Sequence, residues 1–527
     1  MIQTKNINWF YAALILFMVA LPFSEALISF AGVLLLITAF ISPSKKTFAQ
    51  RFQQNKELLI FSSIYSTYLI GLLFTSDFKW ALYDLQKNIP YLIIPFAFII
   101  APQLSRVQLV NLLKIFVVAV SASALITMIS FYSKDEVSVL KAQEFGFIHH
   151  IRFSFQLVFS MIIVSVFLYR EWRQTKGWLK LARLMLLCFL FLFLLWHQSF
   201  TGLLTFLVTA FVGFLLFISQ IKNSGWKIVG WIGIALIIIV PGAYLINAVN
   251  RFYDVDQIEY AQIDQKTALG NPYHHDFQNK QIENGHYVGL YWNEAEMKEA
   301  WNNHSNIKYD ENGGNGYQIK YTLVRYLTSK NLRKDAAGVE QLSDLDIHNI
   351  EAGISNYILA EKGISLYPRI YTSIWELDTY FRSGYANQKS LAQRIEYAKA
   401  AFTIIKANFW FGVGTGNWKT AYREAYQKNH SQMDPARYGD AHNQYLNYMV
   451  KFGLIGLLWI LFAIVYPVVK SRSYRNPIFF LFLISMLVAN FGDSNFETHV
   501  GSSFFVLFYC LFISFALSEC ENQNQLI

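Results

Sequence analysis

The chain has 527 residues, of which 54% are hydrophobic and 15% are charged, and its mean hydropathy is +0.29. So few charges in a chain of this length exclude an ordinary soluble protein and indicate a membrane protein. The formal net charge of +9 does not indicate a nucleic-acid partner, because the basic residues gather in short loops between apolar runs.

Apolar runs long enough to cross a bilayer recur along the chain and predict an all-α integral membrane protein with about 12 transmembrane helices. The first run has no clear small-residue cleavage site after it, so we interpret it as a retained span. The runs fall near 8–23, 26–41, 58–75, 89–101, 109–131, 153–169, 181–198, 202–219, 228–248, 446–469, 477–492 and 501–518.

Loops rich in lysine and arginine predict the orientation of these spans. "SPSKKTFAQRFQQNKE", "REWRQTKGWLKLAR", "IKNSGWK" and "KSRSYRN" alternate correctly with the spans, so the positive-inside rule puts them in the cytoplasm. Both termini are then inside. The predicted outer segments are 76–88, 132–152, 199–201, 249–445 and 493–500.

The polar segment 249–445 divides the chain into three predicted parts. Residues 1–248 hold spans one to nine, 249–445 form a large outer loop that carries the site, and 446–527 hold the last three spans. A loop of this size is usually functional or a small domain. Its first part predicts loops with one short helix, and its second part predicts amphipathic helices such as 338–358 and 390–409.

A polar pair begins the tenth span. Nine residues separate His442 and Asn443 from Gly453-Leu-Ile-Gly456, and the predicted orientation puts the pair at the outer face of the membrane. An ordinary histidine pKa of about 6.5 suits removal of a proton from a hydroxyl group at neutral pH. The alternative interpretation is that the pair caps the helix and the glycines permit close helix packing.

Upstream, Arg394 starts a predicted helix, and Gly412, Gly414 and Gly416 form a turn that leads into another helix. Glycines ahead of a helix N-terminus expose backbone N–H groups that hold phosphate in many proteins. The alternative interpretation is a tight turn without a ligand.

Taken together, Arg394, the turn "ANFWFGVGTGNW", His442-Asn443 and Gly453-Leu-Ile-Gly456, followed at once by a span, resemble the O-antigen ligase and O-antigen polymerase superfamily. The resemblance implies a multi-pass protein of the bacterial inner membrane with a glycosyltransferase C-like helical fold and a large periplasmic loop between helices 9 and 10. It also implies an active site that faces the periplasm. Members transfer a glycan from undecaprenyl diphosphate to an acceptor such as lipid A-core, without a metal or other cofactor.

The resemblance also implies roles for individual residues. His442 is the expected base or acceptor-positioning group, with Asn443 and Gln444 placing it. Without a metal, arginines must hold the diphosphate, because their planar fork matches phosphate oxygens. The outer candidates are Arg152, Arg325, Arg369, Arg382 and Arg394, of which Arg152 and Arg394 are preferred, and each has an ordinary surface charge as its alternative.

One position departs from the pattern of the superfamily. Members commonly carry an arginine in a Ser-Arg-x-Gly turn between two spans, and this chain has "HQSFTGLL" there, with Phe200 in place of the arginine. Arg152 is a possible substitute. Asp440, two residues before His442, either orients the imidazole or belongs to a solvated turn.

Other functions stay open at this point. An O-antigen polymerase or a protein O-glycosyltransferase differs from a ligase only in its acceptor, and membrane lipids are expected partners of all three. A polysaccharide transporter or flippase would predict inverted repeats and charges buried in mid-span, whereas Lys114 and Lys451 lie near span ends. The "HHD" at 274–276 with His286 matches no standard spacing of metal ligands.

Overall fold

The computed structural model describes residues 8–42, 46–133, 145–259, 262–360 and 365–524, and helices dominate this part of the chain. The helices before the large loop are α1 (Trp9–Ala20), α2 (Glu25–Ile41), α3 (Phe48–Gln54), α4 (Glu57–Ile70), η1 (Gly71–Phe74), α5 (Phe78–Asn88), α6 (Pro90–Ile100), α7 (Arg106–Tyr132), α8 (His150–Arg170), α9 (Gly177–Trp196), α10 (Phe200–Gln220) and α11 (Ser224–Tyr253). The loop contains β1 (Ile282–Glu283), β2 (His286–Tyr287), α12 (Glu294–His304), α13 (Ile319–Ser329), α14 (Ala336–Glu340), α15 (Asp344–Glu351), η4 (Tyr357–Ala360), α16 (Tyr367–Ser383), α17 (Ser390–Ala407), α18 (Trp418–Lys428) and η5 (Pro435–Arg437). The last elements are α19 (Gln444–Lys470), η6 (Ser473–Arg475), α20 (Pro477–Gly492), η7 (Asn495–Glu497) and α21 (His499–Asn524).

Each predicted apolar run coincides with a helix. Eight helices of the described ranges are long and apolar enough to cross a membrane, namely α4 with η1, α7, α8, α9, α10, α11, α19 and the first part of α21. α1, α2 and α20 are equally apolar in character but shorter. The helices therefore support an all-α membrane protein, while the count of about 12 spans stays a prediction.

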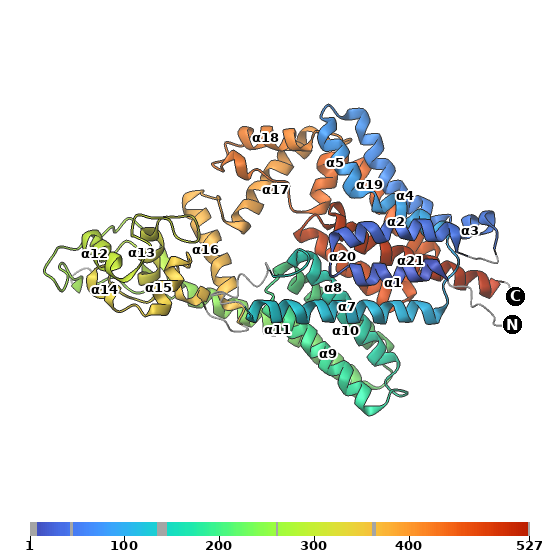
Figure 1. Ribbon diagram of the computed structural model, residues 1–527, viewed down its shortest axis with the longest axis horizontal. Coiled ribbons are helices and arrows are strands. Elements are labelled where there is room, and N and C mark those ends of the chain that lie inside the picture. The colour runs from blue at the N-terminus through green and yellow to red at the C-terminus, as the bar shows by residue number, and fades with distance from the viewer. Residues whose placement is uncertain (1–7, 43–45, 134–144, 260–261, 361–364, 525–527) are drawn as a thin grey trace.

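The bundle is built around α21. All its side chains from Phe504 to Ile513 are buried, and α21 packs against α6, which in turn packs against α4. By contrast, only 11% of the residues in the most apolar 18-residue stretch of α11 are buried, and α11 runs along the edge of the bundle (Figure 1). An apolar helix with so little protein around it needs another apolar environment, which a bilayer supplies.

The outer loop folds into two groups of helices. α12 to α15 surround their own core of Trp301, Tyr309, Leu323 and Leu327 and lie at one end of the molecule (Figure 1). α16 leads from this group back to the bundle, where Tyr371 packs with Phe252 of α11. α17 and α18 then pack against each other, and α17 packs against the start of α19.

Local sequence explains where the loop follows and departs from expectation. α17 confirms the helix predicted over 390–409. The helix predicted over 338–358 is instead divided, because Ser343 caps a new helix at Asp344. The hairpin of β1 and β2 was not predicted. Its turn is formed by Asn284 and Gly285, which both adopt the positive φ angles that such a turn needs.

A bend in α19 lets the α17–α18 turn approach it. Gly453 has φ 61°, and the backbone of Trp410 lies where a side chain at this position would begin. The N–H of Leu454 donates to the carbonyl of Phe409 at 2.8 Å, and the N–H of Val413 donates to the carbonyl of Val450 at 2.9 Å. Gly453, which was predicted to allow close helix packing, therefore allows the backbone of the α17–α18 turn to approach α19, rather than a neighbouring helix.

We expect Gly453→Ala to lower the thermal unfolding midpoint of the detergent-solubilised protein. The substitution combines a left-handed φ with a backbone clash, each costing on the order of 1–3 kcal/mol. Gly242→Ala is the matched control, since Gly242 lies within α11 with nothing within 4 Å of the added Cβ. Equal midpoints for the two variants would contradict this account of the bend.

Candidate active site

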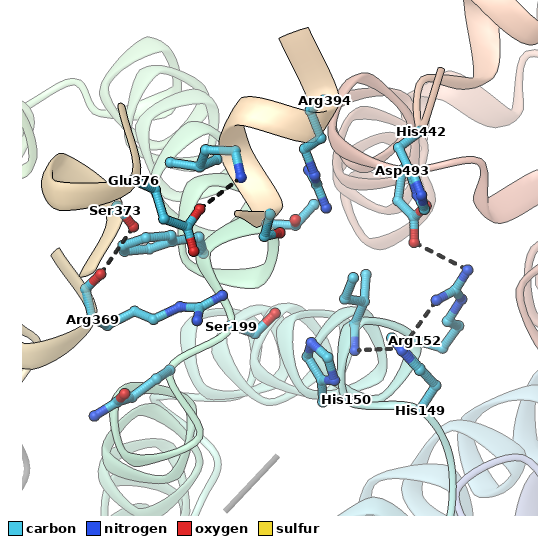
Figure 2. Close-up of a pocket in the computed structure, with 16 residues that line it drawn as sticks. His149, His150, Arg152, Ser199, Arg369, Ser373, Glu376, Arg394, His442 and Asp493 are labelled. Atoms are coloured by element: carbon cyan, nitrogen blue, oxygen red, sulfur yellow. Dashed lines mark hydrogen bonds and ion pairs between the residues drawn. The ribbon is translucent and has the colours of Figure 1, made fainter. Parts of the chain in front are cut away.

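A cavity of about 280 Å³ lies where the outer loop meets the helix bundle (Figure 2). The N-terminal turns of α8, α10 and α17 line this cavity. Helix N-termini favour anions because their free N–H groups and the positive end of the helix dipole point outward. α16 supplies a further wall. The lining residues are His149, His150, Ile151, Arg152, Gln198, Ser199, Phe200, Thr201, Arg369, Ser373, Glu376, Ser390, Leu391, Arg394, His442 and Asp493.

Three arginines reach the cavity from different helices. Arg152 of α8 forms an ion pair with Asp493. Arg394 of α17 donates from Nη1 to the carbonyl of Gly492 at 2.7 Å, and the guanidinium of Arg369 lies 5.6 Å from the ring centre of Phe200. Within the described ranges, neither Arg369 nor Arg394 has a carboxylate at ion-pair distance, so both charges are available to an anionic ligand.

Asp493 joins two of the cavity's functional groups. Its Oδ2 lies 3.0 Å from Nη2 of Arg152, and its Oδ1 lies 3.0 Å from Nδ1 of His442. Burial alone would raise the pKa of Asp493, but the hydrogen bond from His442 and the charge of Arg152 lower it to about 2. The carboxylate is therefore ionised at neutral pH and accepts a hydrogen bond from His442.

His442 is held in one orientation by its backbone and its neighbours. It has φ 44°, an uncommon value for a residue other than glycine, and its ring stacks on Tyr397 at 5.5 Å. The hydrogen bond to Asp493 raises the pKa of His442 above its ordinary value, although burial opposes this. Because Nδ1–H donates to Asp493, the neutral ring keeps a lone pair on Nε2.

Asp440 lies beside this arrangement without contacting the imidazole. It accepts hydrogen bonds from the backbone N–H of His442 at 3.3 Å and from the side chain of Asn447 at 3.1 Å. Its negative charge still contributes to the raised pKa of His442. The carboxylate that orients the ring is thus Asp493 rather than Asp440.

The opposite side of the cavity carries Glu376. Its carboxylate accepts a hydrogen bond from the N–H of Leu391, in the first turn of α17, at 2.9 Å. Burial raises the pKa of Glu376, and burial lowers the pKa of Arg369 on the same helix. Glu376 thereby fixes the N-terminus of α17 relative to α16, and with it the side chain of Arg394.

The other predicted residues near His442 have supporting positions. Asn443 caps α19, accepting from the N–H groups of Tyr445 and Leu446, and its amide donates to the carbonyl of Phe491. Gln444 is fully buried and accepts from the N–H of Phe496 at 2.9 Å. Neither lines the cavity, and both connect the start of α19 to the segment around Asp493.

The glycine turn does not reach the cavity. The N–H groups of Gly412, Gly414 and Gly416 donate to Asn408, Lys451 and Thr75 respectively, so protein oxygens occupy them. A Cβ at any of the three would meet neighbouring backbone atoms. The structure therefore gives these glycines a packing role against α19 and the segment from η1 to the start of α5, and the phosphate cradle expected from the sequence is not formed.

Two predicted arginines also lie elsewhere. Arg325 of α13 donates from Nε to Glu283 at 2.6 Å and stacks over the ring of Trp375 at 4.2 Å. Arg382 pairs with Asp378 one turn earlier on α16 and is half exposed. Both have carboxylate partners inside the loop, so of the five outer arginines only Arg152, Arg369 and Arg394 come together.

Sequence reasoning missed Asp493, Glu376 and His149 as site residues. Asp493 had one available signal, since it is an acidic residue in the short outer segment 493–500. Glu376 lies within an amphipathic helix and offers no local pattern. The position of both depends on how α16, α17 and α20 pack.

Comparison with known families agrees with the resemblance seen in the sequence. Residues 345–461 match the family model described as O-antigen ligase, a range that includes Arg369, Arg394 and His442 but not Arg152 or Asp493. No curated protein matches the chain. Residues 345–461 are thus similar to the O-antigen ligase family, and this match supports a place for the chain in the O-antigen ligase and polymerase superfamily of glycosyltransferases. Together with the apolar helices, the match supports a multi-pass membrane enzyme.

The two arginines without carboxylate partners predict an anion site. We expect inorganic pyrophosphate to bind the detergent-solubilised protein in isothermal titration calorimetry, and Arg369→Met to weaken that binding about tenfold or more, because a charge-assisted pair is lost. Arg423→Met, at an exposed position of α18, is the control and should bind like wild type. Equal affinities in all three proteins would refute the anion site.

Proposed function

We propose that this protein transfers a glycan from undecaprenyl diphosphate to a hydroxyl group of an acceptor, lipid A-core or a similar molecule, at the periplasmic face of the bacterial inner membrane. The observation that carries the proposal is the pairing, in one cavity, of two arginines that have no carboxylate at ion-pair distance in the described ranges with a histidine whose Nδ1 is held by a carboxylate. The two arginines suit the leaving diphosphate, and the histidine suits the acceptor hydroxyl.

In the proposed reaction, the acceptor oxygen forms a bond to the anomeric carbon of the donor sugar, and the bond from that carbon to the diphosphate oxygen breaks. The electron pair of the broken bond stays on the diphosphate, where Arg369 and Arg394 stabilise the growing negative charge. His442 accepts the proton of the acceptor hydroxyl at Nε2, and the resulting imidazolium is stabilised by Asp493. Arg369 and Arg394 thus act on the leaving group, whereas His442 and Asp493 act on the acceptor.

The predicted orientation supports a periplasmic site. Nearly all residues that line the cavity belong to the segments 132–152, 199–201, 249–445 and 493–500, which the positive-inside rule puts outside. The site then opens near the outer leaflet, where a lipid-linked donor and a lipid-linked acceptor both have their head groups. Membrane lipids complete the list of proposed partners.

The acceptor separates three related activities, so it is the subject of the first experiment. Purified protein with a radiolabelled undecaprenyl-diphosphate glycan and a chelator is offered lipid A-core, an acceptor protein or a second lipid-linked repeat unit. We expect label on lipid A-core. Label on the protein or on the second repeat would instead identify a protein O-glycosyltransferase or a polymerase, and no label on any acceptor would favour the transporter alternative.

His442→Ala is expected to lower the transfer rate at least 100-fold while pyrophosphate binding persists, because removal of a general base typically costs about 10²–10⁴ in rate. His348→Ala is the control, since His348 is exposed on α15 and remote from the cavity residues. A His442→Ala protein that transfers at the wild-type rate would exclude an essential role for the imidazole.

Asp493→Asn should shift the pH dependence of transfer. His442 accepts a proton only when neutral, so transfer falls as the pH drops through its pKa, which the hydrogen bond to Asp493 raises. Loss of that anion lowers the pKa of His442, and the acid limb of the rate profile moves to lower pH. The maximal rate should also fall, because an amide that donates to Nδ1 puts the ring proton on Nε2. An acid limb at the wild-type pH would contradict the role given to Asp493.

A further inference from the structure

One wall of the cavity is a chain of hydrogen bonds with a histidine at each end (Figure 2). Nδ1 of His149 lies 3.0 Å from Nη1 of Arg152, and Nη2 of Arg152 lies 3.0 Å from Oδ2 of Asp493. Oδ1 of Asp493 then lies 3.0 Å from Nδ1 of His442. Both rings are therefore held by Nδ1, and among the residues that the structure describes none hydrogen-bonds to either Nε2.

The chemistry of the partners gives the two rings opposite tautomers. A guanidinium group only donates, so Nδ1 of His149 accepts from Arg152, and it also accepts from the N–H of Ile151 at 3.4 Å. The proton of neutral His149 is consequently on Nε2. The carboxylate of Asp493 only accepts, so the proton of neutral His442 is on Nδ1. The wall thus presents one N–H donor and one lone pair.

The surroundings of His149 keep it neutral and fix its ring. The charged and titratable groups around it are His150 and Arg152 of α8, His197 at the end of α9, His442 and Asp493. Burial and the charge of Arg152 lower the pKa of His149. Its ring stacks on that of His150 at 4.4 Å, and in the described part of the chain no residue hydrogen-bonds to its Nε2.

The position of His149 on its helix indicates the ligand it meets. His149 is the N-cap of α8, a helix of 21 residues, and the N–H groups and dipole of such an end favour negative charge. Arg152 in the first turn adds a positive charge, which Asp493 compensates. An N–H donor on a side chain that lines the cavity at this end suits a phosphate oxygen better than a neutral sugar hydroxyl.

We propose that His149 is a second substrate-contacting residue of the reaction, whose Nε2–H donates a hydrogen bond to an oxygen of the lipid diphosphate while His442 takes the acceptor proton. This inference rests on the proposed function. His149 keeps its proton throughout, since the diphosphate leaves with the electron pair of the broken carbon–oxygen bond and is stabilised by hydrogen bonding. Its contribution is thus a neutral donor beside two cationic arginines.

Two substitutions distinguish this role from a merely structural one. In His149→Asn, the side-chain oxygen takes the place of Nδ1 and still accepts from Arg152, but nothing reaches the position of Nε2. In His149→Gln, the amide nitrogen takes the place of Nε2, but the contact with Arg152 is lost. We expect the Asn variant to lose about tenfold or more in kcat and in pyrophosphate affinity, and the Gln variant to stay within about threefold of wild type.

A His149→Gln protein that is less active than His149→Asn would overturn the proposal. If His149 only holds Arg152, the Gln variant is the poorer enzyme and its acid limb shifts, because the contact from Arg152 to Asp493 and His442 is disturbed. His348→Asn, outside the cavity, is the control for both variants. If the wild-type protein transfers glycan and His149→Asn is equally active, this inference alone is refuted. If the wild-type protein neither transfers glycan nor binds pyrophosphate, the proposed function is refuted, and this inference with it.

Discussion

The carboxylate of Asp493 is the group on which the cavity depends, because it connects segments from distant parts of the chain. Its side chain is only 4% exposed, and a buried carboxylate costs several kcal/mol unless it is paired. Arg152 supplies the compensating charge from the start of α8, and His442 supplies an N–H from the segment before α19. Arg152 and Asp493, which are both largely buried, would each be costly in this position without the other, so these two groups form as a pair.

One buried edge of α19 holds the segment that carries Asp493. Gln444, Asn447 and Lys451 are spaced to lie on one side of the helix, and they bind, in order, the N–H of Phe496, the hydroxyl of Ser494 and the carboxylate of Glu497. Lys451 also pairs with Asp84 of α5 at 2.5 Å. A transporter would need charges in mid-span that interact with cargo, whereas Lys451 lies near the start of α19 and is matched by two carboxylates of the protein. Positioning of the 493–497 segment therefore accounts for this buried charge.

The sequence predicted those parts of the site that stand next to a recognisable local pattern. His442 precedes an apolar run, and Arg394 belongs to an amphipathic helix, so their positions followed from periodicity and topology. Asp493 and Glu376 acquire their roles only when separate helices meet; Asp493 is marked only as an acidic residue in a short outer segment, and no local pattern marks Glu376. The glycines at 412–416 were misjudged for a different reason. Glycine serves equally well in a phosphate-binding turn and in a tightly packed one, and the contact with Lys451 that decides between them is tertiary.

The departure at Phe200 shows why a site has to be compared in space rather than along the chain. The superfamily that this chain resembles commonly has an arginine in that turn, and Arg152 was the substitute expected from the sequence. Arg152, however, forms an ion pair with Asp493. The guanidinium that lies against the ring of Phe200 belongs to Arg369, which comes from α16 of the outer loop and has no carboxylate at ion-pair distance in the described ranges. A positive charge thus lies at this point of the cavity, and it comes from a helix of the outer loop. Its position consequently depends on how the outer loop docks on the bundle, through the contact of Tyr371 with Phe252 and the capping of α17 by Glu376.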